Sequence, residues 1–426
     1  MSAPCIGFAG LTHLGLVSAA AVAAKGFSVL GFDADAGRVE AIAAGRLPVA
    51  EPDLDNIFAV HRDRLAFATE TAALGACDMV YISADVPTDA SGSSELAGIA
   101  ALINQVIPEL NPAAVLVVLC QVPPGFTRGL ALPPERRYYQ VETLVLGRAV
   151  ERSLHPERTI VGCDDPTRPL PAAYAALLEV FACPVLRMRY ESAELAKMAI
   201  NCCLAASVTV ANTLAGLAER IGADWGEIAP ALRLDSRIGP HAYLAPGLGL
   251  GGGNLERDLA TVLRLAGETG CEASLIRAVV DSSRHCRDWV LRALHRELLG
   301  RRPDAVLGVL GLAYKENTRS TKNSPAIALL GDLHPWPVRV FDPAVPAAAA
   351  GHPHAVAAAD ALAAADGLDA LAIMTPRPQF RALDPGALAR AMRGRLLVDP
   401  YRVLEGRAAA QAGLDYLTRG APPPRA

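Results

Sequence analysis

The sequence predicts an α/β fold, with two Rossmann-like α/β domains joined by a central helical domain that contains a long helix. Three observations predict it. In the first 120 residues, short apolar runs alternate with helix-like segments, and the same alternation restarts near residue 300. Between them, residues 190–220 contain no proline and no glycine before Gly216. Alternating strands and helices are typical of a parallel sheet with crossover helices, and a long stretch without helix breakers indicates one helix.

The individual elements follow in order from these patterns. A small-residue helix is expected at 15–26, and the long helix over 190–220 is expected to be largely buried. Strands are expected at 5–10, 27–33, 79–84 and 114–120, and again within 304–315 and at 338–343, 368–374 and 394–400. The predicted domains are 1–188, a central helical domain at 189–298, and a second α/β domain at 299–426.

Bulk composition bounds the class of protein. The chain has 426 residues, of which 52% are hydrophobic and 20% charged, so it is long enough for two or three packed domains. The net charge of -4 gives no general attraction to nucleic acid or to an anionic membrane, and neither is expected as a partner. The N-terminus lacks signal-peptide features, and no uninterrupted apolar run approaches the roughly 18 residues of a membrane span.

Nine cysteines form no CxxC pair. They are expected to be buried small hydrophobes in a reducing compartment, which makes the cytoplasm the expected location. No group of His or Cys residues has metal-ligand spacing, so no metal is expected.

The segment after the first expected strand indicates a cofactor. Gly10 and Gly15 have the spacing of a dinucleotide-binding turn in which Thr12 replaces the middle glycine, and Asp33 follows the second strand. Gly10 allows the tight turn, the helix N-terminus attracts the pyrophosphate, and Gly15 permits close packing of helix on strand. Asp33 would bind the ribose hydroxyls and repel a 2'-phosphate, which favours NAD over NADP. The alternative is a glycine-rich turn in an unrelated α/β fold.

Further motifs resemble, in order, those of the UDP-glucose/GDP-mannose dehydrogenase family. They cover nearly the whole chain: EPDL (51–54), ADVPT with GSSEL, CQVPPGFT, ELAKMAIN, DSRIG, PGLGLGGGNLERD, and GLAYKENTRSTKNSP followed by FDP. The resemblance implies NAD-dependent oxidation of a nucleotide-sugar alcohol, usually in two hydride transfers ending in a uronic acid, by a dimer built on the central helix.

The chain departs from the family pattern at informative positions. The nucleophilic cysteine of the family falls on Asn254, and the second glutamate of its PEFLREG segment falls on Leu146, while the first is kept as Glu142. The threonine of STVPPGTT falls on Gln121 and the lysine of the KD pair on Arg257. In the third domain, the family's DDxR falls on Arg319, Ser320 and Lys322.

These departures affect one half of the family's reaction. A cysteine thiolate adds to the aldehyde so that a second hydride can leave, and water then hydrolyses the thioester. An asparagine amide has no comparable nucleophilicity, so Asn254 can only donate or accept hydrogen bonds. The prediction is therefore a single two-electron step, most simply a secondary alcohol oxidised to a ketone, in unusual-sugar or antibiotic biosynthesis.

Three alternatives to this prediction remain open. The chain can be a four-electron 6-dehydrogenase that gives a uronic acid through the hydrated aldehyde. It can be an NAD-dependent epimerase, or a catalytically silent binder of nucleotide sugars.

The resemblance also assigns residues. The expected catalytic residues are Lys197, Asn201, Asp258, Glu142 and Asn254. Lys197 and Asn201 are four residues apart, so they project from one face of a helix. Lys197 would lower the pKa of the reacting hydroxyl or relay its proton, Asn201 would bond the developing oxyanion, and the two carboxylates would orient water. The alternatives are a solvated lysine and a helix-capping aspartate. Cys202 and Cys203 are expected in the core.

Two sets of binding residues complete the expectations. Cofactor contacts are expected at Gly10, Thr12, His13, Leu14, Gly15, Asp33, Val86, Pro87 and Gln121. Contacts with a GDP-, UDP- or dTDP-linked sugar are expected at Glu142, Leu144, Lys197, Arg237, Leu248, Gly249, Gly251, Gly252 and Lys315. The glycine-rich loop 246–252 is expected to wrap the sugar diphosphate with backbone N–H groups, which would explain its glycines.

Overall fold

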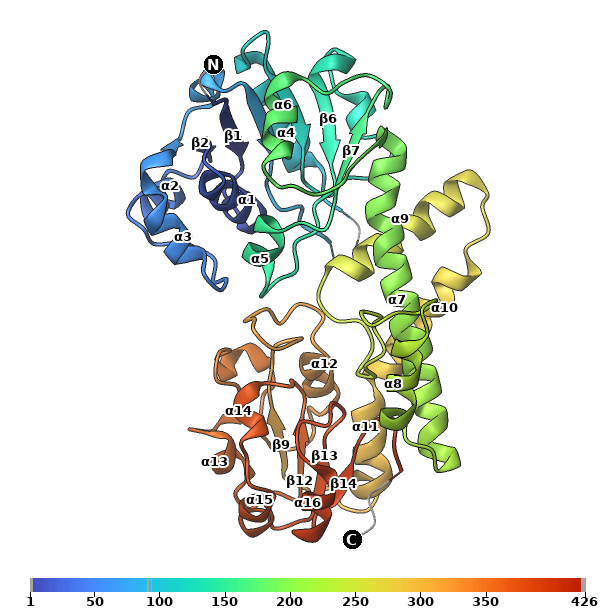
Figure 1. The fold of residues 1–426 in the computed structure, drawn as a ribbon. Coiled ribbons are helices and arrows are strands. Elements are labelled where there is room, and N and C mark those ends of the chain that lie inside the picture. The colour runs from blue at the N-terminus through green and yellow to red at the C-terminus, as the bar shows by residue number, and fades with distance from the viewer. Residues whose placement is uncertain (1–2, 90–91, 93, 423–426) are drawn as a thin grey trace. The chain divides into compact units, whose positions relative to one another are not determined.

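The computed structural model describes residues 3–89, 92 and 94–422. Ser93 of the GSSEL motif lies outside these residues. The chain divides into two compact units, residues 1–200 and 201–426, and each contains a sheet covered by helices. The predicted α/β class is confirmed (Figure 1).

The first unit is built on an eight-stranded sheet in the order β3-β2-β1-β4-β5-β6-β7-β8. Its strands are β1 (Cys5–Ala9), β2 (Ser28–Phe32), β3 (Leu65–Ala68), β4 (Met79–Ile82), β5 (Val115–Val118), β6 (Arg137–Gln140), β7 (Thr159–Cys163) and β8 (Val185–Arg189). The four strands expected from the sequence are β1, β2, β4 and β5. Both β4 (MVYI) and β5 (VLVV) are buried throughout, as apolar runs in the middle of a parallel sheet should be. The pair β6–β7 is antiparallel, unlike the other described pairs of this sheet.

Helices cover this sheet. They are α1 (His13–Ala24), α2 (Ala36–Ala43), α3 (Leu54–Val60), α4 (Ala97–Val106), α5 (Ala149–Leu154) and α6 (Ala172–Glu179). In Figure 1, α1, α5 and α6 lie in front of the strands. Helix α1 packs very closely, because a Cβ on Gly15 would lie 1.9 Å from the carbonyl oxygen of Gly10. Only glycine fits at this crossing of helix and strand.

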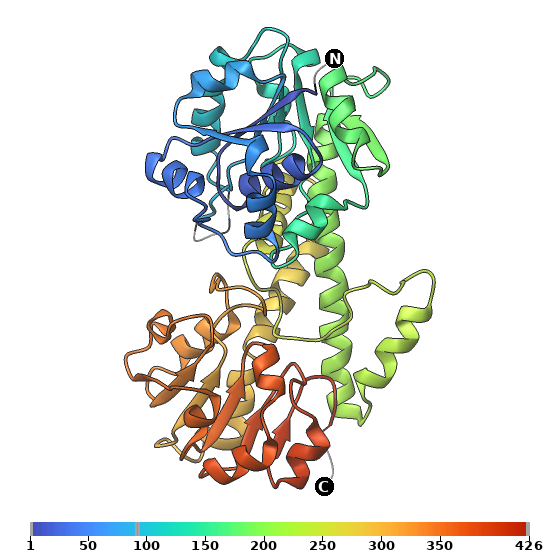
Figure 2. The same ribbon diagram turned by 60° about the vertical axis from the view of Figure 1, so that its left-hand side comes forward.

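The predicted long helix is α7 (Tyr190–Ile221), which is continuous over 32 residues (Figures 1 and 2). By length and composition alone it could cross a membrane. Its buried Glu194 and Asn201 are instead engaged in hydrogen bonds within the first and second units, respectively, as expected of a core helix. The expectation that α7 is largely buried was wrong for one face, where Val210, Leu214, Leu217 and Ile221 are exposed.

The second unit combines the remaining helices with a six-stranded parallel sheet in the order β11-β10-β9-β12-β13-β14. The strands are β9 (Leu307–Leu310), β10 (Val338–Phe341), β11 (Ala355–Ala357), β12 (Ala370–Ile373), β13 (Leu396–Val398) and β14 (Asp415–Leu417). The helices are α8 (Trp225–Leu234), α9 (Asn254–Thr269), α10 (Ser274–Arg287), α11 (Trp289–Leu294), α12 (Pro325–Asp332), α13 (Ala361–Ala365), α14 (Pro378–Arg381), α15 (Pro385–Ala391) and α16 (Gly406–Gln411). The four C-terminal strands expected from the sequence are β9, β10, β12 and β13.

The two sheets begin with the same turn. Gly10 after β1 and Gly311 after β9 both have positive φ, and each donates its N–H to the last residue of the neighbouring strand. The aspartate after that strand, Asp33 or Asp342, accepts a hydrogen bond from the residue that follows the glycine. The second Rossmann-like turn thus repeats the first in its backbone.

The cysteines were expected to be buried, and only some of them are. Cys77, Cys120, Cys163 and Cys286 are buried, but Cys203 on α7 and Cys271 are exposed. Cys203 was expected in the core because its neighbours are apolar. On a helix with one uncovered face, an apolar neighbourhood in sequence does not imply burial.

We expect Gly15→Ala to lower the free energy of unfolding by about 1–3 kcal/mol, because the new methyl group must displace the backbone of Gly10. Denaturant unfolding of the first unit measures this. The control is Gly98→Ala on α4, where an added Cβ meets nothing within 4 Å and should stabilise the helix by up to about 1 kcal/mol. Equal effects of the two substitutions would contradict the close approach.

Candidate active site

The turn between β1 and α1 leaves no room for a side chain at its first residue, Gly10. A Cβ on Gly10 would lie 2.6 Å from the backbone nitrogen of Ala84, in the loop after β4. Gly10 also has φ of +99°, which favours glycine. The bare backbone and the start of α1 together form a cradle of the kind that holds a dinucleotide pyrophosphate.

Asp33 lies at the end of β2, as predicted, and is buried. Its Oδ2 accepts hydrogen bonds from the Leu11 N–H at 2.9 Å and from the guanidinium of Arg38 at 2.8 Å. Arg38 was not predicted from the sequence. It lies on α2, a turn and a half after Asp33, where its charge neutralises a carboxylate that would otherwise be buried alone.

Thr12 and His13 at the start of α1 are bonded to Asp85 in the loop after β4. The Asp85 N–H donates to Thr12 Oγ1 at 2.8 Å, and the His13 N–H donates to Asp85 Oδ2 at 3.0 Å. The carboxylate therefore occupies an N–H group at the positive end of the helix, where a phosphate would otherwise bind. The hydroxyl of Thr12, which replaces the middle glycine, has a structural role in this contact.

The buried carboxylate of Glu51, in the EPDL motif, connects three segments of the first unit. It accepts from His13 Nε2 at 2.8 Å, from the Gly147 N–H at 2.9 Å and from the Ala149 N–H at 3.2 Å. The loop after β6 is thereby tied to the start of α1. This loop also carries Glu142, Leu144 and Leu146, so Glu51 helps to position residues that the sequence assigned to the reaction.

Lys197 and Glu142 form an ion pair in the first unit, with Lys197 Nζ 3.3 Å from Glu142 Oε2. Their side chains are 11% and 16% exposed, so the pair is well shielded from water. Lys197 is therefore not a solvated surface lysine, which was the alternative to a catalytic role. One turn earlier on α7, the buried Glu194 accepts from the N–H groups of Gly125 and Thr127. Burial raises the pKa of Glu194, against the effect of those hydrogen bonds.

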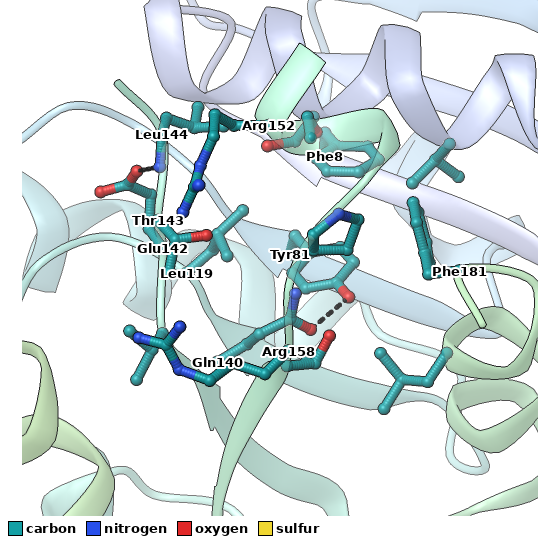
Figure 3. A pocket seen from close by; sticks show the side chains of 17 residues that line it. Phe8, Tyr81, Leu119, Gln140, Glu142, Thr143, Leu144, Arg152, Arg158 and Phe181 are labelled. Carbon is teal, nitrogen blue, oxygen red and sulfur yellow. Dashed lines mark hydrogen bonds between the residues drawn. The ribbon is translucent and has the colours of Figure 1, made fainter. Parts of the chain in front are cut away.

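A small polar pocket opens beside this pair in the first unit (Figure 3). Glu142 and Leu144 line it together with Tyr81, Gln140 and Arg152. The Tyr81 hydroxyl donates to Gln140 Oε1 at 2.8 Å, and burial raises the pKa of Tyr81. The cavity volume of about 70 Å³ suits a few water molecules and is far below the roughly 300–1,000 Å³ of ligand pockets. It is too small for a nucleotide sugar.

In the second unit, a buried polar network surrounds the first turns of α9. Asn201 Nδ2 donates to Asp258 Oδ2 at 2.5 Å, and Arg257 Nε lies 3.7 Å from Asp258 Oδ1. Asp258 is 1% exposed and Arg257 6% exposed. A second nitrogen of Arg257 donates to Asn254 Oδ1 at 3.3 Å. The structure thus brings together Asn201, Asp258 and Asn254, three of the predicted catalytic residues, through an arginine that replaces the lysine of the family pattern.

The glycine-rich loop before α9 packs on its own chain. A Cβ on Gly249 would lie 2.4 Å from the Ser283 carbonyl oxygen, and one on Gly252 would lie 3.0 Å from the Tyr314 ring. Both glycines have positive φ. These contacts require glycine at both positions whether or not a diphosphate binds. The expected diphosphate is therefore not needed to explain these two glycines. The Leu250 N–H in this loop donates to Ser283 Oγ at 2.8 Å.

The other predicted residues lie as follows. Leu14 is buried in α1, Val86 and Gln121 are buried in the loops after β4 and β5, and Pro87 is exposed beside Val86. Leu248 is buried and Gly251 lies against Tyr314. Lys315 Nζ lies over the Tyr314 ring, 5.6 Å from its centre. Arg237 is highly exposed, and its described hydrogen bonds go to Asp235. Among the described residues there is no group of three or more potential metal ligands.

Sequence reasoning missed Arg38, Asp85 and the roles of Glu51 and Glu194. Arg38 had a local signal, since it follows Asp33 on the next helix. Asp85, Glu51 and Glu194 each accept a hydrogen bond from the backbone N–H of a residue at least 67 positions away along the chain. Only their membership of the ADVPT, EPDL and ELAK motifs pointed to these positions.

Comparison with known proteins identifies the family. The NAD binding domain of the UDP-glucose/GDP-mannose dehydrogenase family matches residues 5–182, its central domain matches 191–285, and its UDP binding domain matches 308–406. The chain is 30% identical to the UDP-glucose 6-dehydrogenase of Pseudomonas aeruginosa, and the match covers 97% of this chain and 96% of that protein.

Solved structures agree with this result. A UDP-glucose dehydrogenase from the archaeon Pyrobaculum islandicum has a TM-score of 0.86 and 30% identity, with 97% of each chain covered. A UDP-D-ManNAc dehydrogenase from Pyrococcus horikoshii shares the fold, with a TM-score of 0.82, 22% identity and coverage of 98% of this chain and 99% of that chain. The chain belongs to the UDP-glucose/GDP-mannose dehydrogenase family and is an NAD-dependent nucleotide-sugar dehydrogenase.

Proposed function

We propose that this enzyme removes one pair of hydrogens from a nucleotide-activated sugar and stops at a carbonyl, most simply by oxidising a secondary alcohol to a ketone. The amide of Asn254 carries the proposal. Its carbonyl oxygen accepts from Arg257, so its NH₂ group is the part left to face a substrate oxygen. A hydrogen-bond donor polarises a carbonyl but forms no covalent adduct with it, and the second oxidation needs such an adduct.

The loss of a second group supports the same conclusion. Leu146 stands where the family pattern has the glutamate associated with hydrolysis, and an apolar side chain can neither activate nor hold water. A ketone cannot be oxidised to an acid without breaking a carbon–carbon bond, so both replacements are tolerated if the product is a ketone. Ketones are substrates for transaminases, and we place this step in the biosynthesis of an unusual sugar or an antibiotic.

The Lys197–Glu142 pair is suited to accept a proton and to stabilise an oxyanion. Glu142 takes the proton of the reacting hydroxyl, directly or through water, while the Lys197 ammonium donates to the oxygen that loses it. The low exposure of the pair strengthens the attraction between the ammonium and the developing negative charge. Asn201 and Asp258 hold the start of α9 and thereby position Asn254.

The cradle at the start of α1 fits NAD. Gly10 and Gly15 leave its backbone bare, and Asp33 lies at the end of β2, where it would bind the ribose hydroxyls. NAD, when bound, supplies the acceptor for the hydride. Thr12, His13 and Leu14 would contact the pyrophosphate, and Val86, Pro87 and Gln121, which follow β4 and β5, would border the rest of the cofactor. Asp85 must give up the His13 N–H when a phosphate arrives.

We propose that the nucleotide sugar is bound by the loop containing Leu248, Gly249, Gly251 and Gly252, by Lys315, and by Glu142 and Leu144. The support for Lys315 is its place beside Tyr314, which packs against Gly251 and Gly252. Lys315 would then pair with a phosphate of the substrate. Arg237 is a further candidate, although its guanidinium is bonded to Asp235 in this structure.

We also propose that the enzyme forms a homodimer through α7. Val210, Leu214, Leu217 and Ile221 follow a spacing of three and four residues, so they form one exposed apolar stripe along the helix. An apolar stripe of this length is costly in water and typical of a helix that packs on another helix. A second copy of α7 offers a matching stripe by symmetry.

We expect one NADH per sugar consumed and a product two hydrogens lighter, when the enzyme is given NAD and a panel of UDP-, GDP- and dTDP-sugars. Absorbance at the NADH band and mass spectrometry of the product measure this. Asn254→Cys should leave the ratio at one if the product is a ketone. Two NADH with a carboxylate from the unchanged enzyme would contradict the proposal.

Lys197→Ala provides the control for turnover. It should lower the rate by about 10²–10⁴-fold while NAD binding persists. Lys25→Ala, at the end of α1, should leave the rate unchanged. An isomerised sugar without net NADH would indicate an epimerase. Turnover that is unchanged in Lys197→Ala would contradict the role of the ion pair, and no turnover with any sugar would favour a silent binder.

For Asp85→Ala, we expect two opposite effects. The free protein should lose about 1 kcal/mol of stability, because a cap of α1 is removed. Its affinity for NAD should rise about fivefold, because phosphate no longer competes with a carboxylate at the helix N-terminus. Thermal unfolding and titration with NAD measure the two effects. Asp63→Ala, which changes an exposed acid in the same unit, should alter neither. Lower NAD affinity in Asp85→Ala would show that Asp85 assists the cofactor.

The dimer is tested by placing charge in the stripe. Leu214→Glu combined with Leu217→Glu should change the mass in solution from that of two chains to that of one, because each new carboxylate would be buried in the helix pair. Light scattering after size-exclusion chromatography measures the mass. Val60→Glu, at an exposed position of α3, is the control and should leave the mass unchanged. A double variant with the mass of two chains would exclude this face as the interface.

A further inference from the structure

The second unit contains a large cavity that the proposed reaction does not use. It lies where the last turns of α7, helices α10 and α11 and the segment after β14 meet. Its volume is about 760 Å³, within the range of pockets that bind metabolites. The polar residues that line it include Arg220, His285, Arg292, Arg296 and Arg419. None of these residues is part of the polar network around α9.

Arg419 forms the buried part of this lining. It is 3% exposed, its guanidinium stacks on the Trp289 ring at 5.6 Å, and one terminal nitrogen donates to the Asn212 carbonyl at 3.0 Å. Among the described residues, its Nε has no hydrogen-bond partner and lies 3.4 Å from a carboxylate oxygen of Glu219. Glu219 thus pairs with Arg419 without a hydrogen bond to Nε, and a buried donor in that state is stabilised by a further acceptor.

The charges of the cavity are unbalanced. Glu219 is the only acid among the described residues that line the cavity. It is shared, since it also accepts hydrogen bonds from Trp289 Nε1 at 3.2 Å and from the Gly420 N–H at 2.9 Å. Arg296 is paired with Glu297 outside the lining. Arg220 and Arg292 have no ion pair within 4.0 Å in the described part of the chain, and Arg292 donates to the His285 carbonyl.

The cations repel one another as a result. Arg292 lowers the pKa of His285, an effect that burial, Arg419 and Arg220 reinforce and Asp288 opposes. Burial lowers the pKa of Arg292, and Arg419 adds to this, while Asp288, Cys286 and Glu219 act in the opposite direction. Positive groups that destabilise each other's charge are stabilised together by a bound anion.

We propose that this cavity is a binding site for a small, multiply charged phosphate compound, separate from the sites for NAD and the nucleotide sugar. Arg220 and Arg292 bind its outer phosphate at the open side, and Arg419 binds the inner one. The planar guanidinium forks suit bidentate bonds to phosphate oxygens. The cavity has room for more than a single phosphate ion, and several arginines match a ligand with more than one charge.

The first test is isothermal titration calorimetry of the full chain with pyrophosphate, at about 0.15 M ionic strength so that weak surface attraction is screened. Saturating NAD and UDP are present to fill the other phosphate sites. We expect binding by the unchanged protein, and at least about tenfold weaker binding by Arg220→Gln combined with Arg292→Gln. Fluorescence of Trp289, which contacts Arg419, should change in the same titration.

Arg264→Gln is the matched control, because Arg264 is an exposed arginine on α9 of the same unit, paired with Glu268 outside the cavity. It should bind pyrophosphate as the unchanged protein does. The two cavity substitutions are at exposed positions and should leave the melting temperature and the NADH-forming activity unchanged. The oligomeric state is recorded in each titration, because Leu217 belongs both to the cavity lining and to the proposed dimer face.

Three results would overturn the proposal. They are no binding of pyrophosphate or of ATP, equal affinity of the cavity variant and the Arg264→Gln control, and tighter binding of citrate than of pyrophosphate. The last would assign the cavity to polycarboxylates. Failure of the proposed oxidation leaves these measurements unaffected, because they follow binding and not turnover.

Discussion

The buried carboxylate of Asp258 is the constraint on which the candidate site in the second unit depends. Water does not reach it, so the protein must supply its hydrogen-bond donors. Asn201 from α7 donates a hydrogen bond to it, and Arg257, the preceding residue on α9, brings a positive charge to within 3.7 Å. Because Arg257 is held there, another of its nitrogens meets the side chain one turn back, at Asn254. The orientation of the amide at the start of α9 therefore follows from the need to neutralise one charge.

Features with a local signal could be predicted from the sequence. Gly10 and Gly15 mark a turn that only glycine can make, and Asp33 ends the neighbouring strand, so three residues close in sequence define the cofactor cradle. The long helix α7 follows from the absence of proline and from a run without glycine up to Gly216. Apolar runs predicted β4 and β5 because buried parallel strands have no polar positions.

Features that depend on partners far along the chain could not be predicted. No pattern around Asp85 shows that it contacts the start of α1, and none around Glu194 shows that it holds the loop after β5. The strands β6 and β8 were missed because charged and polar residues interrupt their short apolar runs. The antiparallel pairing of β6 with β7 depends on the path of the connecting segment. The exposure of Cys203 depends on what covers α7, which its own sequence does not state.

The repeated turn in the two sheets has a consequence for cofactor stoichiometry. Asp33 is paired with Arg38, whose side chain is 33% exposed and can move aside when a ribose arrives. The equivalent Asp342 has no exposed side-chain surface, and Arg377, 6% exposed, is bonded both to it and to the Thr318 carbonyl. Arg377 thus occupies the position beside Asp342 that a ribose would need. We therefore expect a chain with two dinucleotide-like turns to bind a single NAD.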